Sequence, residues 1–297
     1  MAETDKQIAS GAELAGLTRS GTSSRNLFAT GMSILVAVFT LVTLIPLVAV
    51  IFDVAREGIG LLSLDLFTQL PPPPGLSEGG FGHAIIGTLI TLGIGALLSV
   101  PFGVMAAVYL TEFGRGTRIA YWVRFAANVL SGVPAILCGL FAYGVVVLTT
   151  GSFSAFAGGV ALSVVMVPIV LRTAEEGLLL VPLEVRQASL ALGANQFQTI
   201  SKIVIPAALP AIATGVTLSL ARAGGEAAPL LFTALNNNFW STDPTQPIAT
   251  MSVLIYFFSI IPYKPQQQLA WAAALVLLVI ILTFSITSRV ITAQKKY

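Results

Sequence analysis

The sequence predicts an all-α polytopic membrane protein with six transmembrane helices, and three observations lead to this fold class. Hydrophobic residues make up 56% of the 297 residues and charged residues only 9%, whereas soluble domains carry roughly 25% charged residues. The chain also contains six long apolar runs, and a helix needs about 20 apolar residues to cross the hydrocarbon core. Finally, most lysine and arginine residues lie in the two tails and in every second loop between these runs.

The apolar runs set the boundaries of the expected elements. We expect a polar, partly disordered tail at 1–26, and a short tail at 292–297. Between them lies one membrane domain, 27–291, with spans at about 27–52, 83–110, 121–148, 153–171, 203–235 and 269–291. A stiff proline run at 71–74 lies in the first external loop and excludes a helix there.

Two segments depart from the pattern of simple spans. Residues 248–261 form an apolar run that is too short to cross, so we expect a re-entrant or interfacial helix. Gly132 and Pro134 predict a break inside the third span. Such a break either lines a substrate path or allows close helix packing, and the sequence favours neither.

The distribution of positive charge predicts that both termini lie in the cytoplasm. With this orientation, only Arg56 and Lys264 fall outside, and Arg222 lies within the fifth run. The remaining lysine and arginine residues are cytoplasmic or lie at that interface: Lys6, Arg19, Arg25, Arg115, Arg118, Arg124, Arg172, Arg186, Lys202, Arg289, Lys295 and Lys296.

A polar segment, 172–202, separates the fourth and fifth runs on the cytoplasmic side. Pro182 suits the first turn of a short helix, and Glu184 is favoured there by the helix dipole. Gly193 can adopt the left-handed conformation that ends such a helix, and a second helix begins near Gln196. From the residues alone, an amphipathic connector on the membrane surface and a rigid projecting knob are equally acceptable.

The spacing within this segment resembles the ATPase-coupling loop of ABC importer permeases. That loop carries an acid and two small residues, then a glycine after three residues, and a closing isoleucine and proline after nine more. The matching positions here are Gln187, Ala188, Ser189, Gly193, Ile203 and Pro206, with Gln187 in place of the acid and Ser189 in place of an alanine. The resemblance implies a type I permease architecture, and a helix that docks on a cytoplasmic ATPase by apolar packing or through Glu184 and Arg186.

Two pairs of opposite charges lie in or beside the apolar runs. Arg222 and Glu226 are four residues apart and are expected to share a helix face. Intramembrane charges mark either a pathway or a structural ion pair, and the residues favour these equally. Arg172 and Glu175, three apart, are better explained by an arginine that snorkels to the interface than by an inner gate.

The run from Arg222 to Asp243 closely resembles the phosphate-specific ABC importer permeases of the PstA type. The residues that carry the resemblance are Arg222, 225–235 (GEAAPLLFTAL), 238–243 (NFWSTD) and 268–272 (QLAWA). The resemblance implies a phosphate pathway in a bacterial inner membrane, with Arg222, Glu226, Arg172 and Glu175 as its residues. It also implies three partners: a PstC-type permease, a dimer of ATPase subunits and an external phosphate-binding protein.

The chemistry that the sequence lacks limits the alternatives. No G-x-x-x-x-G-K-[ST] motif occurs, so ATP and Mg are expected on a partner subunit and this chain is not an enzyme. A single histidine, His83, and a single cysteine, Cys138, give no metal or redox cluster, so no cofactor and no nucleic acid are expected. His83 is expected at the external interface, and Cys138 in helix packing. A permease for sulfate or molybdate, or an ion-coupled secondary carrier, remain the alternative functions.

Overall fold

The computed structural model describes residues 24–293, and every regular element in this range is a helix. The tails predicted at the two ends therefore lie almost wholly outside the described residues. The elements are α2 (Ser24–Ile59), α3 (Asp65–Thr68), α4 (Gly82–Val108), η1 (Tyr109–Phe113), α5 (Arg118–Gly132), α6 (Ala135–Ala142), η2 (Tyr143–Val147), α7 (Leu148–Thr150), α8 (Ala155–Leu179), α9 (Leu183–Ala191), α10 (Gln196–Thr199), η3 (Ile200–Val204), α11 (Ile205–Gly225), α12 (Ala228–Leu231), α13 (Met251–Ile260) and α14 (Lys264–Ala293).

The chain divides after Asp53 into two units. The first unit contains most of α2, an apolar helix in which Asn26–Ile59 is long enough to cross a membrane. Pro46 lies inside this helix, as is tolerated in membrane helices.

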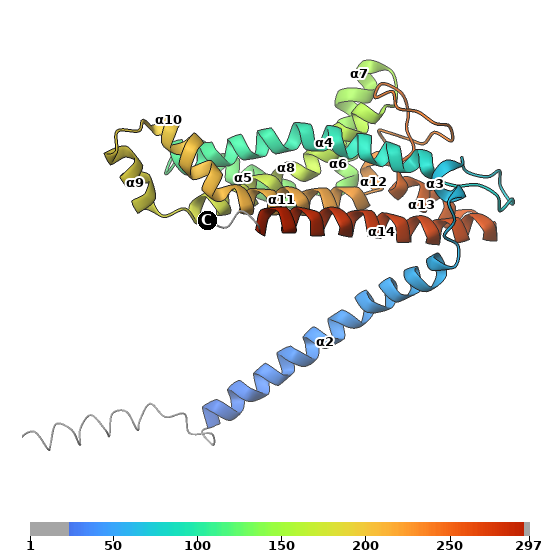
Figure 1. Cartoon of the computed structure of the whole chain (residues 1–297), viewed down its shortest axis with the longest axis horizontal. Helices are drawn as coiled ribbons and strands as arrows, with labels where there is room; N and C mark the ends of the chain where they lie inside the picture. Colours follow the sequence, from blue (N-terminus) through green and yellow to red (C-terminus); the bar gives the residue numbers. More distant parts are fainter. Residues whose placement is uncertain (1–23, 294–297) are drawn as a thin grey trace, which may run out of the picture. The chain divides into compact units, whose positions relative to one another are not determined.

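The second unit is a helical bundle built around α8. In Figure 1, α4 and α11 run alongside it, α14 packs against α11, α9 and α10 lie at one end, and α3 lies at the other. We call these the α9 end and the α3 end. Small residues let the helices approach closely: a Cβ added at Gly103 of α4 would lie 2.9 Å from Val170 Cγ1 of α8. The position of α8 is therefore fixed by backbone proximity as well as by apolar contact.

The number of spans agrees with the predicted fold class. Within the described residues, five helices are long and apolar enough to cross a membrane. Two helical segments, Arg118–Gly132 and Ala135–Thr150, meet the same criteria together and are bent by 108° at the break, so the number is six when the pair is counted as one span. Val133 has an extended backbone at the bend and Pro134 follows it. Proline lacks an N–H and disfavours helical geometry in the preceding residue, so the predicted break is confirmed.

Several boundaries differ from the sequence prediction. The fourth span continues as α8 to Leu179, so Arg172 and Glu175 lie on a helix and not in a loop. Arg172 is exposed and Glu175 is half-buried, so their charges do not end the helix, which continues to Leu179. The fifth span ends at Gly225, and α12 follows as a separate turn. The short run expected at 248–261 contains the ten-residue helix α13.

Candidate functional site

Arg222 and Glu226 form an ion pair at the end of α11. Arg222 Nε lies 3.7 Å from Glu226 Oε1, and the two side chains are 49% and 24% exposed. Glu226 does not share the helical face predicted for it, because the helix ends at Gly225 and Glu226 has extended backbone angles. The contact is longer than a good hydrogen bond. The arginine therefore keeps most of its donors available to another group.

The segment after Glu226 is held tightly by two neighbouring helices. Ser252 Oγ at the start of α13 donates a 3.2 Å hydrogen bond to the Glu226 carbonyl. On the other side, Gly139 of α6 packs directly on Pro229 of α12, and a Cβ at Gly139 would lie 2.5 Å from Pro229 Cα. The broken third span thus supports the backbone that carries the ion pair.

Arg172 and Glu175, which the sequence explains better by a snorkelling arginine than by an inner gate, do not form an ion pair with each other. Glu175 Oε1 accepts a 2.7 Å hydrogen bond from Nε of Arg124, a residue of α5. Arg124 also donates from Nη2 to the Leu110 carbonyl, 3.2 Å away. Arg172 is exposed and takes part in none of the ion pairs found among the described residues. Glu175 is therefore neutralised by a residue of a different helix, and the charge of Arg172 is available to another partner.

The packing of α11 on α8 places the charged residues at successive levels of the bundle. Gly215 contacts Thr173, so Arg172 lies near the level of Gly215. Arg222 lies seven residues further along α11, which corresponds to about 10 Å towards the α3 end. Glu175 and Arg124 lie about one turn beyond Arg172, in the opposite direction. Charged groups therefore occur at three depths between the two ends.

Helices α9 and α10 form a projecting knob within the polar segment 172–202, one of the two arrangements that the sequence left open. Gly193 has φ +88° and joins the two helices in the left-handed conformation expected of it. Asn195 caps α10 in a capping box with Gln198, and Ser189 bonds to Thr199 across the turn at 2.9 Å. Internal hydrogen bonds therefore hold the knob rigid.

The knob presents apolar side chains on its outer surface. Leu192 is 89% exposed and Phe197 is 76% exposed. Leu183, Val185 and Leu190 are also exposed. Glu184, Gln187 and Ala188 are exposed beside them, as is Pro206, whereas Ile203 is half-buried where the chain re-enters the bundle. Apolar exposure of this extent on a polar loop is typical of a surface that another protein covers.

Arg186 does not belong to that outer surface, although the sequence suggested it as a docking residue. Its side chain is 9% exposed and its Nη2 lies 3.0 Å from Glu112 Oε1 of η1. It also donates to the carbonyls of Val181 and Leu178, at 2.7 Å each. Spacing along the chain could not reveal this contact, because Glu112 lies 74 residues away. Glu112 and Arg124 are the two functional candidates that sequence reasoning missed, and the only signal for Arg124 was a charge inside an apolar run.

The loop at 236–250 closes the α3 end over the start of α4. His83, expected at an exposed interface, is only 2% exposed and meets Trp240 edge-on, with ring centroids 6.2 Å apart. Asp243 accepts hydrogen bonds from the side chain and the backbone of Thr245. These bonds lower the pKa of the Asp243 carboxyl below its ordinary value of 3.8. The motif at 238–243 therefore covers the bundle and stabilises its own turn.

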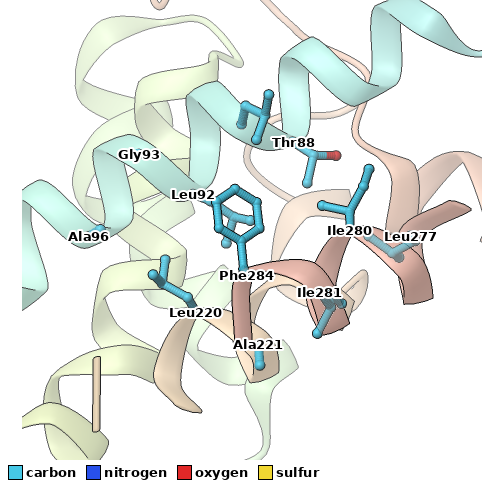
Figure 2. A pocket seen from close by; sticks show the side chains of 11 residues that line it. Thr88, Leu92, Gly93, Ala96, Leu220, Ala221, Leu277, Ile280, Ile281 and Phe284 are labelled. Carbon is cyan, nitrogen blue, oxygen red and sulfur yellow. The ribbon is translucent and has the colours of Figure 1, made fainter. Parts of the chain in front are cut away.

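An apolar pocket of about 230 Å³ lies between α4, α11 and α14. In Figure 2, Leu92, Leu220 and Phe284 point towards one another across it. Its hydroxyl, from Thr88, already donates to the Ala84 carbonyl and accepts from the Met251 amide. The pocket has no free donor for an anion, so it is not a site for a charged substrate.

A polytopic helical bundle with a projecting apolar knob at one end and arginines along its spanning helices has the architecture of a membrane permease. The model of the family of binding-protein-dependent transport system inner membrane components matches residues 99–296. The chain therefore belongs to this family, and relatives that are 43% and 42% identical over most of both lengths place it among the PstA-type permeases.

Named relatives carry this assignment, and solved structures share the fold. The chain is 43% identical to the phosphate transport system permease protein PstA of Yersinia pestis, over 84% of this chain and 85% of the relative. It is 42% identical to the protein of that name from Haemophilus influenzae, over 83% and 87%. The fold is similar to a chain of the MetNI methionine ABC transporter (TM-score 0.57, 21% identity, 72% and 94% covered). It is also similar to a chain of a bacterial alginate ABC transporter (TM-score 0.58, 17% identity, 90% and 96% covered).

Proposed function

We propose that this chain is the membrane-spanning subunit of an ATP-driven importer for inorganic phosphate. One observation carries the proposal: relatives named for phosphate transport share 43% and 42% of their residues with it over most of both lengths. The chain forms the path together with a homologous permease of the PstC type. A dimer of ATPase subunits holds ATP and Mg, and an external phosphate-binding protein delivers the substrate.

The same proposal fixes the orientation in the bacterial inner membrane. Both termini and the α9 end face the cytoplasm, and the α3 end faces outward. The distribution of lysine and arginine supports this orientation, since only Arg56 and Lys264 lie in segments at the α3 end.

Arg222 is the outer phosphate contact in this proposal. A guanidinium can grip two phosphate oxygens at once through its planar fork. Glu226, 3.7 Å away, offsets part of the positive charge. A site on a conduction path has to release its ion as well as bind it, and a partly neutralised arginine meets both needs. Tight capture then belongs to the external binding protein.

Arg172 is the next contact, about 10 Å further inward along the helices. Because Glu175 pairs with Arg124, the charge of Arg172 is available to an anion that leaves Arg222. Glu175, held by Arg124, lies at the inner limit of the path. A phosphate ion thus meets positive charge at successive depths and is bound tightly at none of them.

The ATPase-coupling surface is the apolar outer face of α9 and α10. Leu192 and Phe197 project furthest, and Gln187 provides no charge. Glu184 is the one ionic group of the predicted coupling set on this face, since Arg186 is buried. Docking therefore depends on shape and apolar burial, with Glu184 at its edge.

Phosphate uptake by the reconstituted complex tests the pathway. Arg222→Gln removes the charge and the fork while keeping a similar length, so uptake is expected to stop although the complex still assembles. Arg118→Gln is the matched control, because Arg118 is an exposed arginine at the α9 end. Normal uptake by Arg222→Gln would leave the pair with a structural role only.

Two further measurements separate this function from its alternatives. The tagged chain, purified from its native membrane, is expected to bring an ATPase subunit with it. An ion-coupled secondary carrier would come alone and would transport without ATP. Competition between phosphate, sulfate and molybdate in the uptake assay then identifies the oxyanion, and stronger competition by sulfate or molybdate would contradict the phosphate assignment.

A further inference from the structure

The last turn of α4 is a π-helix, η1 (Tyr109–Phe113). π-Helical turns are rare and frequently occur at functional sites. Two of the ion pairs among the described residues meet at this turn from different directions. One pair reaches it from α9, on the proposed ATPase side, and the other connects it to Glu175 on α8.

The contact from α9 is a buried clamp. Arg186 and Glu112 are each 9% exposed at the side chain, and Nη2 lies 3.0 Å from Oε1. Arg186 also binds the Leu178 and Val181 carbonyls at the end of α8. Removal of one member of a buried pair leaves an uncompensated charge and is strongly destabilising. A displacement of α9 therefore has to move η1 or break this pair.

The contact towards the path passes through Arg124. Its Nη2 binds the Leu110 carbonyl inside η1 at 3.2 Å, while its Nε binds Glu175 Oε1 at 2.7 Å. One guanidinium thus joins the backbone of η1 to the inner acid of the path. Glu175 also has Arg172 one turn earlier on the same helix, so a second partner lies within reach if Arg124 is displaced.

The clamp has room and an unused donor for a second arrangement. Arg186 Nε is buried without a hydrogen-bond partner, so Glu112 binds the guanidinium by one nitrogen instead of two. A cleft of about 350 Å³ beside it is lined by Thr111, Glu112, Arg186 and Gln187, among others. A small shift of α9 would allow the side-on, two-nitrogen contact that Arg–carboxylate pairs favour.

We propose that Glu112, Arg186 and Arg124 are positioning residues that transmit movement of the coupling helix α9 through η1 to Glu175. When α9 moves, η1 follows, the Leu110 carbonyl shifts, and Arg124 releases or recaptures Glu175. Glu175 then neutralises Arg172 in one state and exposes it to phosphate in the other. This inference rests on the proposed function, because it takes Arg172 and Glu175 to lie on the phosphate path.

The test uses the full complex in proteoliposomes, with phosphate uptake and ATP hydrolysis measured in the same vesicles. For Glu112→Gln and for Arg124→Gln, hydrolysis is expected to continue while the phosphate moved per ATP falls roughly 10-fold, within the usual range for coupling between sites. Arg118→Gln, on the same helix as Arg124, is expected to keep the wild-type ratio. A wild-type ratio in assembled Arg124→Gln would overturn the relay.

A double-mutant cycle separates transmission from local damage. Glu112 and Arg124 act on one chain of contacts, so the double variant is expected to lose no more coupling than either single variant. Strictly additive losses would overturn the relay. If Glu112→Gln does not assemble, replacement of both Glu112 by Leu and Arg186 by Met removes the buried charges together, which is often tolerated. If this double variant assembles and moves as much phosphate per ATP as the wild type, the relay would also be overturned.

Failure of the proposed function looks different. In that case the wild-type complex would hydrolyse ATP without taking up phosphate, and no variant would be informative about uptake. Phosphate uptake by the wild type together with normal coupling in the variants rejects only the relay.

Discussion

The contact between Gly139 and Pro229 gives a sharp test of how the broken span supports the site. Alanine at position 139 would place Cβ 2.5 Å from Pro229 Cα and 2.7 Å from its carbonyl oxygen. Ordinary contact begins at 3.4 Å, so α12 has to retreat by the difference, about 0.9 Å. The obstacle is backbone, which cannot rotate away. Overpacking of this kind costs about 1–3 kcal/mol, or roughly a 5- to 150-fold change in the unfolding equilibrium.

The matched control is Gly144→Ala in the same broken span. A Cβ at Gly144 meets nothing within 4 Å. This variant therefore gains the higher helix propensity of alanine over glycine, about 1 kcal/mol, and introduces no clash. Both variants are purified in detergent and unfolded with increasing SDS while helicity is followed. We expect Gly139→Ala to unfold at clearly lower SDS than Gly144→Ala. Equal unfolding curves for the two variants would refute the argument that this contact is tight.

Two further predictions concern the loops at the ends of the bundle. Gly193 has φ +88°, and asparagine adopts this left-handed conformation more readily than alanine does. Gly193→Ala is therefore expected to lower the free energy of unfolding by about 1–2 kcal/mol, and Gly193→Asn by less. Unfolding in SDS measures both losses, and equal losses would contradict the prediction. The hydrogen bonds from Thr245 lower the pKa of the Asp243 carboxyl. Their contribution to stability is therefore fully present above the ordinary pKa of an aspartate and is lost as the pH falls through the lowered pKa. Thr245→Val should raise that pKa in a carboxyl NMR titration, and an unchanged midpoint would contradict the cause.

The sequence predicts those parts of the fold that depend on local pattern. Apolar runs predict the spans, because a helix has to match the thickness of the membrane. Gly132 and Pro134 predict the break in the third span, and Gly193 predicts the left-handed turn after α9. Each of these effects acts within a few residues, so one sequence is enough to find it.

The ion pairs could not be predicted in the same way. Arg124 and Glu175 are 51 residues apart, and Arg186 and Glu112 are 74 apart. The nearest opposite charge along the helix suggested Arg172 for Glu175, but α5 packs beside α8 and brings Arg124 closer. Likewise, Arg186 lies in a polar stretch that looks exposed, yet the end of α8 and η1 cover it. Tertiary packing decides these pairings.

The bend between α5 and α6 has a consequence for how the chain is made in the cell. Its residues Ser131, Gly132 and Pro134 are exposed when the chain is viewed alone, and they lie midway along a span. Backbone that is not helical cannot face lipid tails, because its polar groups would find no partner there. A newly inserted copy without the partner permease proposed above would therefore present a defect in mid-membrane. We expect such orphan copies to be recognised by membrane quality control and degraded, so that the amount of this subunit in the cell follows the supply of its companion.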